Sequence, residues 1–246
     1  MPFLFPRKKS AFLLAGLVLM LVVPILLNRS SQVNPPEEAR ERSIPKPPPS
    51  SSEEADALIQ QASENYFYHE YGKAAENYQK AIVLYEGQKD LTRAAKTYES
   101  LGDLYKTAQK PEEAEKNYIL AADYHKRIEN YPGQARAMKE LGDLHVSLER
   151  PDLANEWYQK ALRVFEDREP HLVLALVQEA LGHLNWEIQK IPEAIQYFTQ
   201  ARNTFVVVKN PMGFDHMNNV LNRLNNEPNP HSHALRNVPP GGRPAE

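Results

Sequence analysis

The chain has 246 residues, with 29 Lys and Arg, 32 Asp and Glu, and no cysteine, which excludes disulfides, thiolate nucleophiles and zinc–sulfur sites. Residues 53–226 hold 20 basic and 27 acidic residues, a balance of −7, and this argues against nucleic-acid binding because such binding needs a basic surface. Only six of the 20 prolines lie in residues 53–226, so this middle part is expected to hold the folded core.

A basic segment followed by an apolar segment opens the chain. Residues 1–10 carry Arg7, Lys8 and Lys9, and residues 11–27 contain no charge. As a helix, the apolar run would span about 26 Å, close to the hydrocarbon thickness of a bilayer. We favour an uncleaved transmembrane signal anchor over a cleaved signal peptide, because the run is long and no Ala-x-Ala-like site follows it.

The basic residues at the start predict the orientation of this anchor. Positive charge stays on the cytoplasmic side, so residues 1–10 are expected to be cytoplasmic. The rest of the chain would then lie on the non-cytoplasmic side of the membrane, which is the periplasm if the protein is bacterial. With cleavage instead, the chain would be a secreted or periplasmic protein.

Two segments of low complexity flank the middle part. Residues 28–52 hold six Pro and six Ser without hydrophobic periodicity, which predicts an extended, solvated linker. Residues 227–246 carry five Pro together with Gly241 and Gly242, which predicts a disordered tail. His231 and His233 in this tail lack a third ligand, so no metal site is predicted there or elsewhere.

A forty-residue repeat organises residues 53–226. Leu-Gly-Asp-Leu-Tyr at 101–105 returns as Leu-Gly-Asp-Leu-His at 141–145 and as Leu-Gly-His-Leu-Asn at 181–185. Twelve residues after each glycine comes an alanine, then an aromatic residue four further on, and then another alanine after three more. The matching positions of the four units are Ala62, Ala74, Tyr78, Ala81; Gly102, Ala114, Tyr118, Ala121; Gly142, Ala154, Tyr158, Ala161; and Gly182, Ala194, Phe198, Ala201.

This spacing predicts two antiparallel helices in each unit. The alanines and the aromatic residue fall on one stripe of the second helix. The glycine lies inside the first helix, where it costs about 1 kcal/mol relative to alanine, and a neighbour that approaches too closely for a larger side chain would explain it. All six prolines are expected at helix starts: Pro111, Pro132, Pro151, Pro170, Pro192 and Pro211.

The repeats predict an all-α fold. Each helix pair leaves an apolar face that only the next pair can cover, as in a solenoid. We expect a right-handed α-solenoid of four helix pairs in residues 53–226, closed by a C-terminal capping helix after Pro211. Nine helices and no strand are therefore predicted, preceded in the chain by the single transmembrane helix.

The small and aromatic positions resemble the tetratricopeptide repeat family, a helix-turn-helix module of thirty-four residues. Gly102, Ala114, Tyr118 and Ala121 match its signature, and Tyr98 matches its aromatic position near the start of the first helix. The resemblance covers about residues 55–225. The proline that follows the family's second helix is absent, so the second helices are expected to run longer and to account for the six extra residues.

The first helices of such a stack line a concave groove, and the repeat register predicts which side chains face it. Aromatic candidates lie at the two ends and mixed charges between them. Such a groove suits an extended or helical peptide with both signs of charge. The candidates are Tyr66, Phe67, Lys96, Glu99, Asp103, Lys106, Arg136, Lys139, Asp143, Glu179, His183 and Trp186.

The resemblance also bears on what the groove can bind. Family members that hold a peptide's terminal carboxylate use lysine, asparagine and arginine there. Lys139 occupies one of these places, but Asp143 stands where asparagine is needed and would repel an anion. Capture of a terminal carboxylate is therefore disfavoured.

The sequence contains no phosphate-binding glycine loop, metalloprotease motif or nucleophile elbow, so neither enzymatic activity nor a cofactor is expected. The resemblance implies a protein–protein interaction scaffold. We expect it to be membrane-anchored through its N-terminal helix and to bind a protein or peptide in the groove. Two alternatives stay open: a structural subunit that self-assembles into homo-oligomers within a membrane-associated complex, and a cleaved, exported soluble binding protein.

Overall fold

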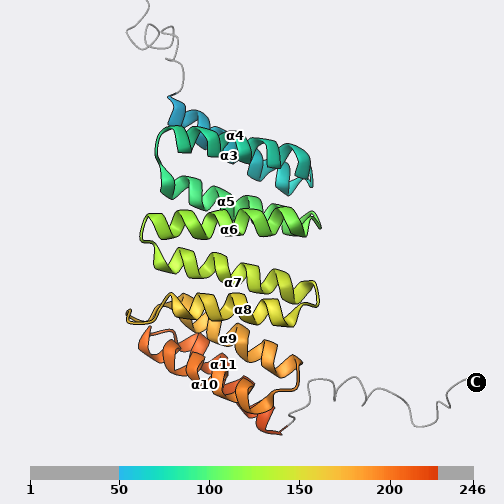
Figure 1. Cartoon of the computed structure of the whole chain (residues 1–246), viewed down its shortest axis with the longest axis vertical. Helices are drawn as coiled ribbons and strands as arrows, with labels where there is room; N and C mark the ends of the chain where they lie inside the picture. The colour runs from blue at the N-terminus through green and yellow to red at the C-terminus, as the bar shows by residue number, and fades with distance from the viewer. Residues whose placement is uncertain (1–49, 227–246) are drawn as a thin grey trace, which may run out of the picture. The chain divides into compact units, whose positions relative to one another are not determined.

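The computed structural model describes residues 50–226, which form nine α-helices and contain no strand (Figure 1). The helices are α3 (Ser51–Phe67), α4 (Tyr71–Gly87), α5 (Leu91–Thr107), α6 (Pro111–Arg127), α7 (Tyr131–Ser147), α8 (Pro151–Arg163), α9 (Leu172–Glu187), α10 (Ile191–Val207) and α11 (Pro211–Asn226). The predicted all-α fold is confirmed for these residues, and the handedness of the superhelix stays a prediction.

Several predicted segments lie outside the described residues: the cytoplasmic start at 1–10, the anchor at 11–27, nearly all of the linker at 28–52, and the tail at 227–246. Within residues 50–226, none of the helices combines the length and the apolar character needed to cross a membrane.

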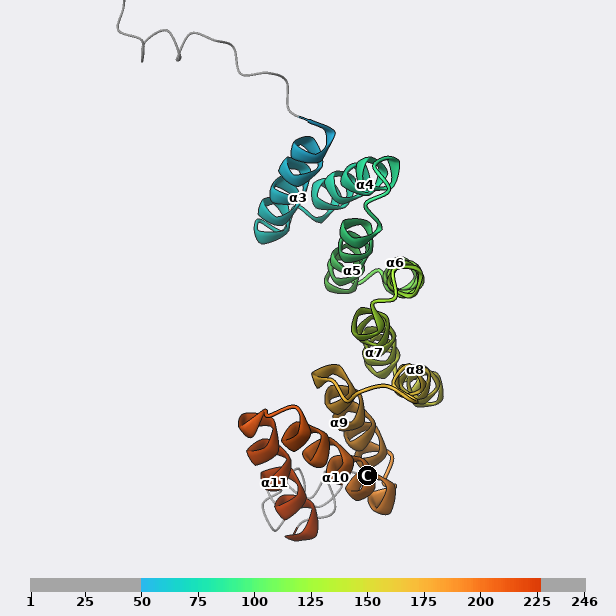
Figure 2. The same ribbon diagram turned by 90° about the vertical axis from the view of Figure 1, so that its left-hand side faces the viewer.

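The nine helices form four pairs and a final single helix. Figure 2 shows α3, α5, α7 and α9 along one side of the stack and α4, α6 and α8 along the other. Helices α3 to α7 and α10 have 17 residues each, and three-residue turns join most of them. Two helices and two turns therefore make up the forty-residue period. First and second helices are equally long in the first two units, and the expectation that the second helices account for the six extra residues stays a prediction.

The first helix begins earlier than the sequence suggested. Helix α3 starts at Ser51 instead of residue 53, because Ser50 and Glu53 form a reciprocal capping box. The Glu53 amide donates to Ser50 Oγ at 3.2 Å, and the Ser50 amide donates to Glu53 Oε2 at 2.8 Å. The last two residues of the predicted linker are therefore helical.

First and second helices begin in different ways. Asp90, Asn130 and Asn210 cap α5, α7 and α11, each accepting a hydrogen bond from the amide three residues on, at 3.0, 3.1 and 2.9 Å. Helices α6, α8 and α10 have no such side-chain cap. They carry proline in their first two positions, as α7 and α11 also do, and no helical hydrogen bond is lost there. Five of the six prolines that were predicted at helix starts occupy one of the first two positions of a helix. Pro170 does not, because it belongs to the loop between α8 and α9.

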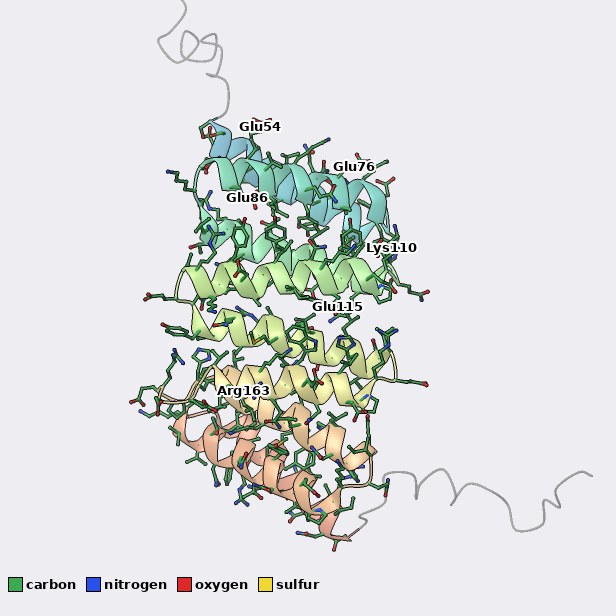
Figure 3. All side chains as sticks on the ribbon, viewed as in Figure 1. Glu54, Glu76, Glu86, Lys110, Glu115 and Arg163 are labelled. Atoms are coloured by element: carbon green, nitrogen blue, oxygen red, sulfur yellow. The ribbon has the colours of Figure 1, made fainter. Side chains whose placement is uncertain are left out.

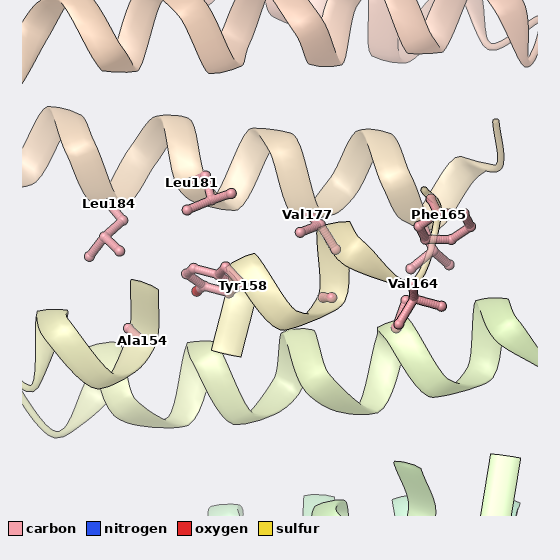
Figure 4. Packing of buried hydrophobic residues seen from close by; sticks show 10 residues of the cluster. Ala154, Tyr158, Val164, Phe165, Val177, Leu181 and Leu184 are labelled. Atoms are coloured by element: carbon pink, nitrogen blue, oxygen red, sulfur yellow. The ribbon is translucent and has the colours of Figure 1, made fainter. Parts of the chain in front are cut away.

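The aromatic residue of each second helix packs onto the small residue of the preceding first helix. A Cβ atom added to Gly102 would lie 2.7 Å from the Tyr118 ring, and one added to Gly182 would lie 2.5 Å from the Phe198 ring. Figure 4 shows Tyr158 in its cluster, near Ala154 and Leu181. The explanation of the glycines from close helix approach is therefore confirmed.

Polar bonds also link successive units. Glu86 lies near the end of α4 (Figure 3). It accepts hydrogen bonds from the hydroxyls of Tyr98 on α5, at 2.9 Å, and of Tyr124 on α6. Burial and the bond to Glu86 raise the pKa of the Tyr98 hydroxyl well above its usual range. This carboxylate thus ties the first unit to both helices of the second.

Candidate functional site

Hydrogen bonds and ion pairs between first helices connect several of the predicted groove residues, and we call the surface that these residues share the groove surface. The Tyr66 hydroxyl and Thr107 Oγ1 lie 3.0 Å apart and connect α3 to α5. Lys106 Nζ donates to Glu140 at 2.7 Å and connects α5 to α7. Because α3, α5 and α7 lie along one side of the stack (Figure 2), these bonds follow the groove from repeat to repeat.

The charged candidates in the middle of the groove surface pair with one another. Arg136 on α7 donates to Glu99 on α5 at 3.3 Å. Asp103 accepts from the Tyr118 hydroxyl at 2.5 Å and lies 3.9 Å from Lys106 Nζ. Most of these charges are therefore neutralised within the protein, and this part of the groove offers a partner little net charge.

Lys139 is held by two carboxylates. Its Nζ lies 2.6 Å from Asp143 and 3.6 Å from Glu140, and Asp143 also accepts from the Tyr158 hydroxyl at 2.6 Å. Burial alone would lower the pKa of Lys139, but the nearby Asp143 and Glu140 outweigh it and raise the pKa. The lysine is thus charged and already paired, which agrees with the expectation that it does not capture a terminal carboxylate.

The remaining candidates lie toward the ends of the groove surface or face solvent. Phe67 is 74 % exposed at the end of α3, where its ring meets that of Tyr68 edge-on, with centroids 5.2 Å apart. Lys96 is exposed on α5. Trp186 on α9 is half-buried, with its ring 6.4 Å from the Phe198 ring and the Arg223 guanidinium 6.0 Å from its centroid.

A pocket of about 430 Å³ opens between α7, α8 and α9. Four of the twelve predicted residues line it: Lys139, Asp143, Glu179 and His183. Its apolar wall comes from Val146, Leu176, Ala180 and Leu184, and Tyr158 and Glu187 complete the lining. The pocket can therefore accept an apolar side chain between groups of both charges.

One change in the repeat accompanies this pocket. Leu176 occupies the position that Arg136 holds forty residues earlier. Arg136 reaches across to Glu99 on the preceding first helix, whereas the apolar Leu176 lines the pocket beside Lys139 and Asp143. An ion pair between first helices is thus replaced by an apolar wall.

Glu179, His183 and His216 come together where α9 faces α11. Glu179 Oε1 lies 3.9 Å from His183 Nε2 and 3.3 Å from His216 Nε2. Burial raises the pKa of the Glu179 carboxyl, against the opposing effects of His216 and Lys139, and burial lowers the pKa of His183. The three side chains offer one carboxylate and two imidazoles as ligand atoms, all within 4.8 Å of one another.

Two polar residues that contact the candidates were not predicted from the sequence: Glu140 and His216. The repeat register contained a signal for His216, which lies forty residues after Leu176 and therefore falls on a groove-facing position of the capping helix. Glu140 gave no such signal, because its role depends on the distance between α5 and α7. It bonds to Lys106 on one helix and lies near Lys139 on its own.

These helices define a solenoid protein built from helical hairpins. The hairpins at residues 93–167 match the family profile of the tetratricopeptide repeat. The resemblance predicted from the sequence is thereby confirmed. No curated protein matches the chain.

Solved structures of other proteins share the fold. Aspartyl phosphate phosphatase F from Bacillus subtilis superimposes with a TM-score of 0.63 and 14% identity, over 76% of this chain and 49% of that one. A signal transduction ATPase with numerous domains from Pyrococcus horikoshii, which has a tetratricopeptide repeat sensor, gives a TM-score of 0.59 and 15% identity, over 70% and 27%. The chain thus spans about half of the first protein and about a quarter of the second.

Proposed function

We propose that this protein is a membrane-anchored interaction scaffold whose groove surface binds a protein or peptide partner. Tetratricopeptide repeats indicate a protein–protein interaction scaffold. The pocket between α7, α8 and α9 is the observation that carries the proposal, because it is the part of the groove surface where apolar side chains and charges surround an open volume. The role proposed is binding, not catalysis.

The lining of the pocket suggests the chemistry of the partner. Val146, Leu176 and Leu184 favour an apolar side chain, and burying one contributes about 1.5–3 kcal/mol. Glu179 and Glu187 favour a basic residue beside it, since Lys139 and Asp143 already neutralise each other. The best fit is therefore a peptide with an apolar anchor and a neighbouring Lys or Arg.

Site-specific photo-crosslinking in cells tests this proposal. A photoreactive amino acid replaces Leu176 in the pocket or, as a matched control, Leu153, which is exposed on α8 and does not line the pocket. We expect a discrete crosslinked partner from position 176 and none from position 153. Equal products from both positions, or none from position 176, would contradict binding in the groove.

Anchoring through residues 11–27 is the second part of the proposal and rests on the basic and apolar pattern of the first 27 residues. The anchor would concentrate the groove near the membrane on the non-cytoplasmic side, which favours even modest affinities. N-terminal sequencing of the mature chain distinguishes the two interpretations. An intact start is expected, whereas a start near residue 28 would favour the exported soluble protein.

Self-assembly is an alternative favoured by apolar side chains exposed on second helices, namely Val83 on α4, Ile119 and Leu120 on α6, and Val206 on α10. Light scattering of the full chain in detergent measures the mass of the particle. A monomer at all concentrations would exclude this alternative, and a concentration-dependent dimer would favour it.

A further inference from the structure

A cluster of three metal-ligating side chains bridges the last repeat and the capping helix. Glu179 and His183 lie one helical turn apart on α9, and His216 reaches the same point from the second turn of α11. The side chain of Glu179 is 20% exposed, that of His183 45%, and that of His216 57%. The ligand atoms therefore gather at a place that an ion from solution can reach.

The distances suit a small divalent cation. In a tetrahedral site with bonds of about 2.0–2.2 Å, the ligand atoms lie about 3.3–3.6 Å apart. Glu179 Oε1 is 3.3 Å from His216 Nε2 and 3.9 Å from His183 Nε2, and the three atoms lie within 4.8 Å of one another. Side-chain rotations that move these atoms by about 1 Å would complete the geometry.

Aromatic packing fixes the ring of His183. The Phe198 ring meets it edge-on with centroids 4.9 Å apart, and the Trp186 ring stacks at 6.4 Å. In the two preceding units the aromatic residue is tyrosine, and its hydroxyl donates to an aspartate at the position of His183. Phe198 has no hydroxyl that could hydrogen-bond to the imidazole, and His183 Nε2 lies 3.9 Å from Glu179 Oε1.

The repeat provides an internal comparison. Glu99, Asp103 and Arg136 occupy the same three positions eighty residues earlier, and Arg136 forms an ion pair with Glu99 at 3.3 Å. A guanidinium keeps its proton and does not ligate metals. Two imidazoles replace the aspartate and the arginine near the capping helix, so the structural ion pair of the earlier unit has become a set of one carboxylate and two imidazoles.

We propose that Glu179, His183 and His216 bind a divalent transition-metal ion of the zinc class, with water or a partner's side chain as a further ligand. One carboxylate and two imidazoles are a ligand set that zinc uses in proteins. The ion fastens the capping helix α11 to α9. Because Glu179 and His183 also line the pocket, the ion neutralises the Glu179 carboxylate, and Glu187 remains in the lining as the acidic group that favours a basic residue of the partner.

Titration calorimetry of the full chain with ZnCl2, in detergent and without a histidine tag, tests the site. We expect one zinc ion per chain. His216→Ala, which removes an exposed side chain, should weaken binding at least about 10–100-fold, since even losing an outer partner of a ligand has an effect of that size. Glu179→Gln is expected to weaken binding as well, with the circular dichroism of both variants unchanged.

The matched control is the double variant His231→Ala with His233→Ala, which removes the tail histidines and should bind zinc like the wild type. Thermal unfolding gives a second readout, because a ligand that binds only the folded state raises the Tm. Zinc should raise the Tm of the wild type and of the tail variant, but not of His216→Ala. Loss of binding in the tail variant, or equal binding in His216→Ala and the wild type, would overturn the proposal.

Discussion

The absence of a side chain at Gly142 allows α7 and α8 to pack closely. The Tyr158 ring occupies the space that a Cβ atom would need, and it is held there by its hydrogen bond of 2.6 Å to Asp143. Tyr158 is only 2% exposed, so the ring has little room to move away. Gly72 in α4 has no atom within 4 Å of its missing Cβ and gives a matched comparison.

Gly142→Ala is therefore expected to destabilise the protein and Gly72→Ala to leave it unchanged or more stable. Overpacking against Tyr158 should cost about 1–3 kcal/mol, whereas alanine at the open position gains up to about 1 kcal/mol of helix propensity. Urea unfolding of the two variants and the wild type measures both free energies. Equal effects at the two positions would contradict the packing role of the repeated glycine.

A second prediction at this scale concerns pH. Burial and the hydrogen bond of 2.6 Å to Asp56 raise the pKa of Tyr85 from 10.0 to about 12. Between these two values the unfolded chain has lost the proton and the folded chain keeps it, so rising pH favours unfolding. The stabilisation is fully present below pH 10 and is lost as the pH rises toward 12.

The free energy of unfolding should therefore fall more steeply above pH 10 in the wild type than in Tyr85→Phe, which has no proton to lose at this site. Urea unfolding between pH 8 and pH 11.5 gives the two slopes. Tyr68→Phe, which changes an exposed tyrosine, is the control and should keep the wild-type slope. If Tyr85→Phe also kept the wild-type slope, Tyr85 would not be the cause of the steeper fall in the free energy of unfolding above pH 10.

At the scale of the helix, the turns repeat as regularly as the helices. Most turns contain one non-glycine residue with a positive φ, and these residues recur at 69, 89, 109, 129 and 149 and again at 189 and 209. At the end of α5 the Lys110 amide donates to the Tyr105 carbonyl at 2.9 Å and the Gln109 amide to the Lys106 carbonyl at 3.2 Å, which is a Schellman motif. The left-handed residue is thus required by the motif, whatever its side chain.

Gln109→Gly should accordingly stabilise the protein. The left-handed conformation, with φ 57°, costs an ordinary residue about 1–2 kcal/mol and glycine almost nothing, while the greater freedom of glycine in the unfolded chain returns about 0.4–1 kcal/mol. We expect a net gain of about 0.5–1 kcal/mol in chemical unfolding. Gln109→Ala keeps the strain and should give no gain, so equal stability of the two variants would argue against this account.

The sequence predicted those features that depend on neighbours along the chain. Alanine, glycine and proline at fixed spacing predict the number of helices in residues 50–226 and most of their starts. The early end of α8 was not predictable in this way. Val164 and Phe165 turn into the core instead of continuing the helix, and the Arg168 guanidinium lies 3.9 Å from the centroid of the Tyr131 ring on α7. That arrangement depends on contacts with α7, which the repeat pattern does not encode.

The same distinction applies to the groove. The register predicted that Glu99, Lys106, Arg136 and Lys139 share a surface, since each stands at a fixed distance from its glycine. It did not predict that Lys106 pairs with Glu140 or that Glu179 meets both His183 and His216. Those pairings depend on the separation of successive first helices, which is set by packing between units.

For the whole array of helices, equivalent positions of successive units form one row along the groove surface. Glu99 with Arg136 and Glu179 with His216 are related by eighty residues and have the same separation of 3.3 Å. The backbone thus presents two equivalent triplets of positions, Glu99, Asp103 and Arg136 in one and Glu179, His183 and His216 in the other. The side chains at these positions decide what each triplet binds. If this is correct, a function proposed for one triplet can be moved to another by substitution alone.

Asp103→His, Tyr118→Phe and Arg136→His, combined in the His216→Ala background, should restore zinc binding at the earlier triplet with Glu99 as the carboxylate. Tyr118→Phe is included because the Tyr118 hydroxyl would otherwise lose its acceptor, Asp103. Calorimetry with ZnCl2 should again give one ion per chain. The control omits Arg136→His and keeps every other change. It also keeps the native, buried His125, whose Nε2 lies 3.3 Å from Glu99 Oε1, so the control shows what binding occurs without a histidine at position 136. If zinc binding is restored only when Arg136→His is present, ligands from two successive first helices, in repeat register, suffice to form the site. If the complete variant does not bind zinc, α9 and α11 differ from α5 and α7 in more than their side chains.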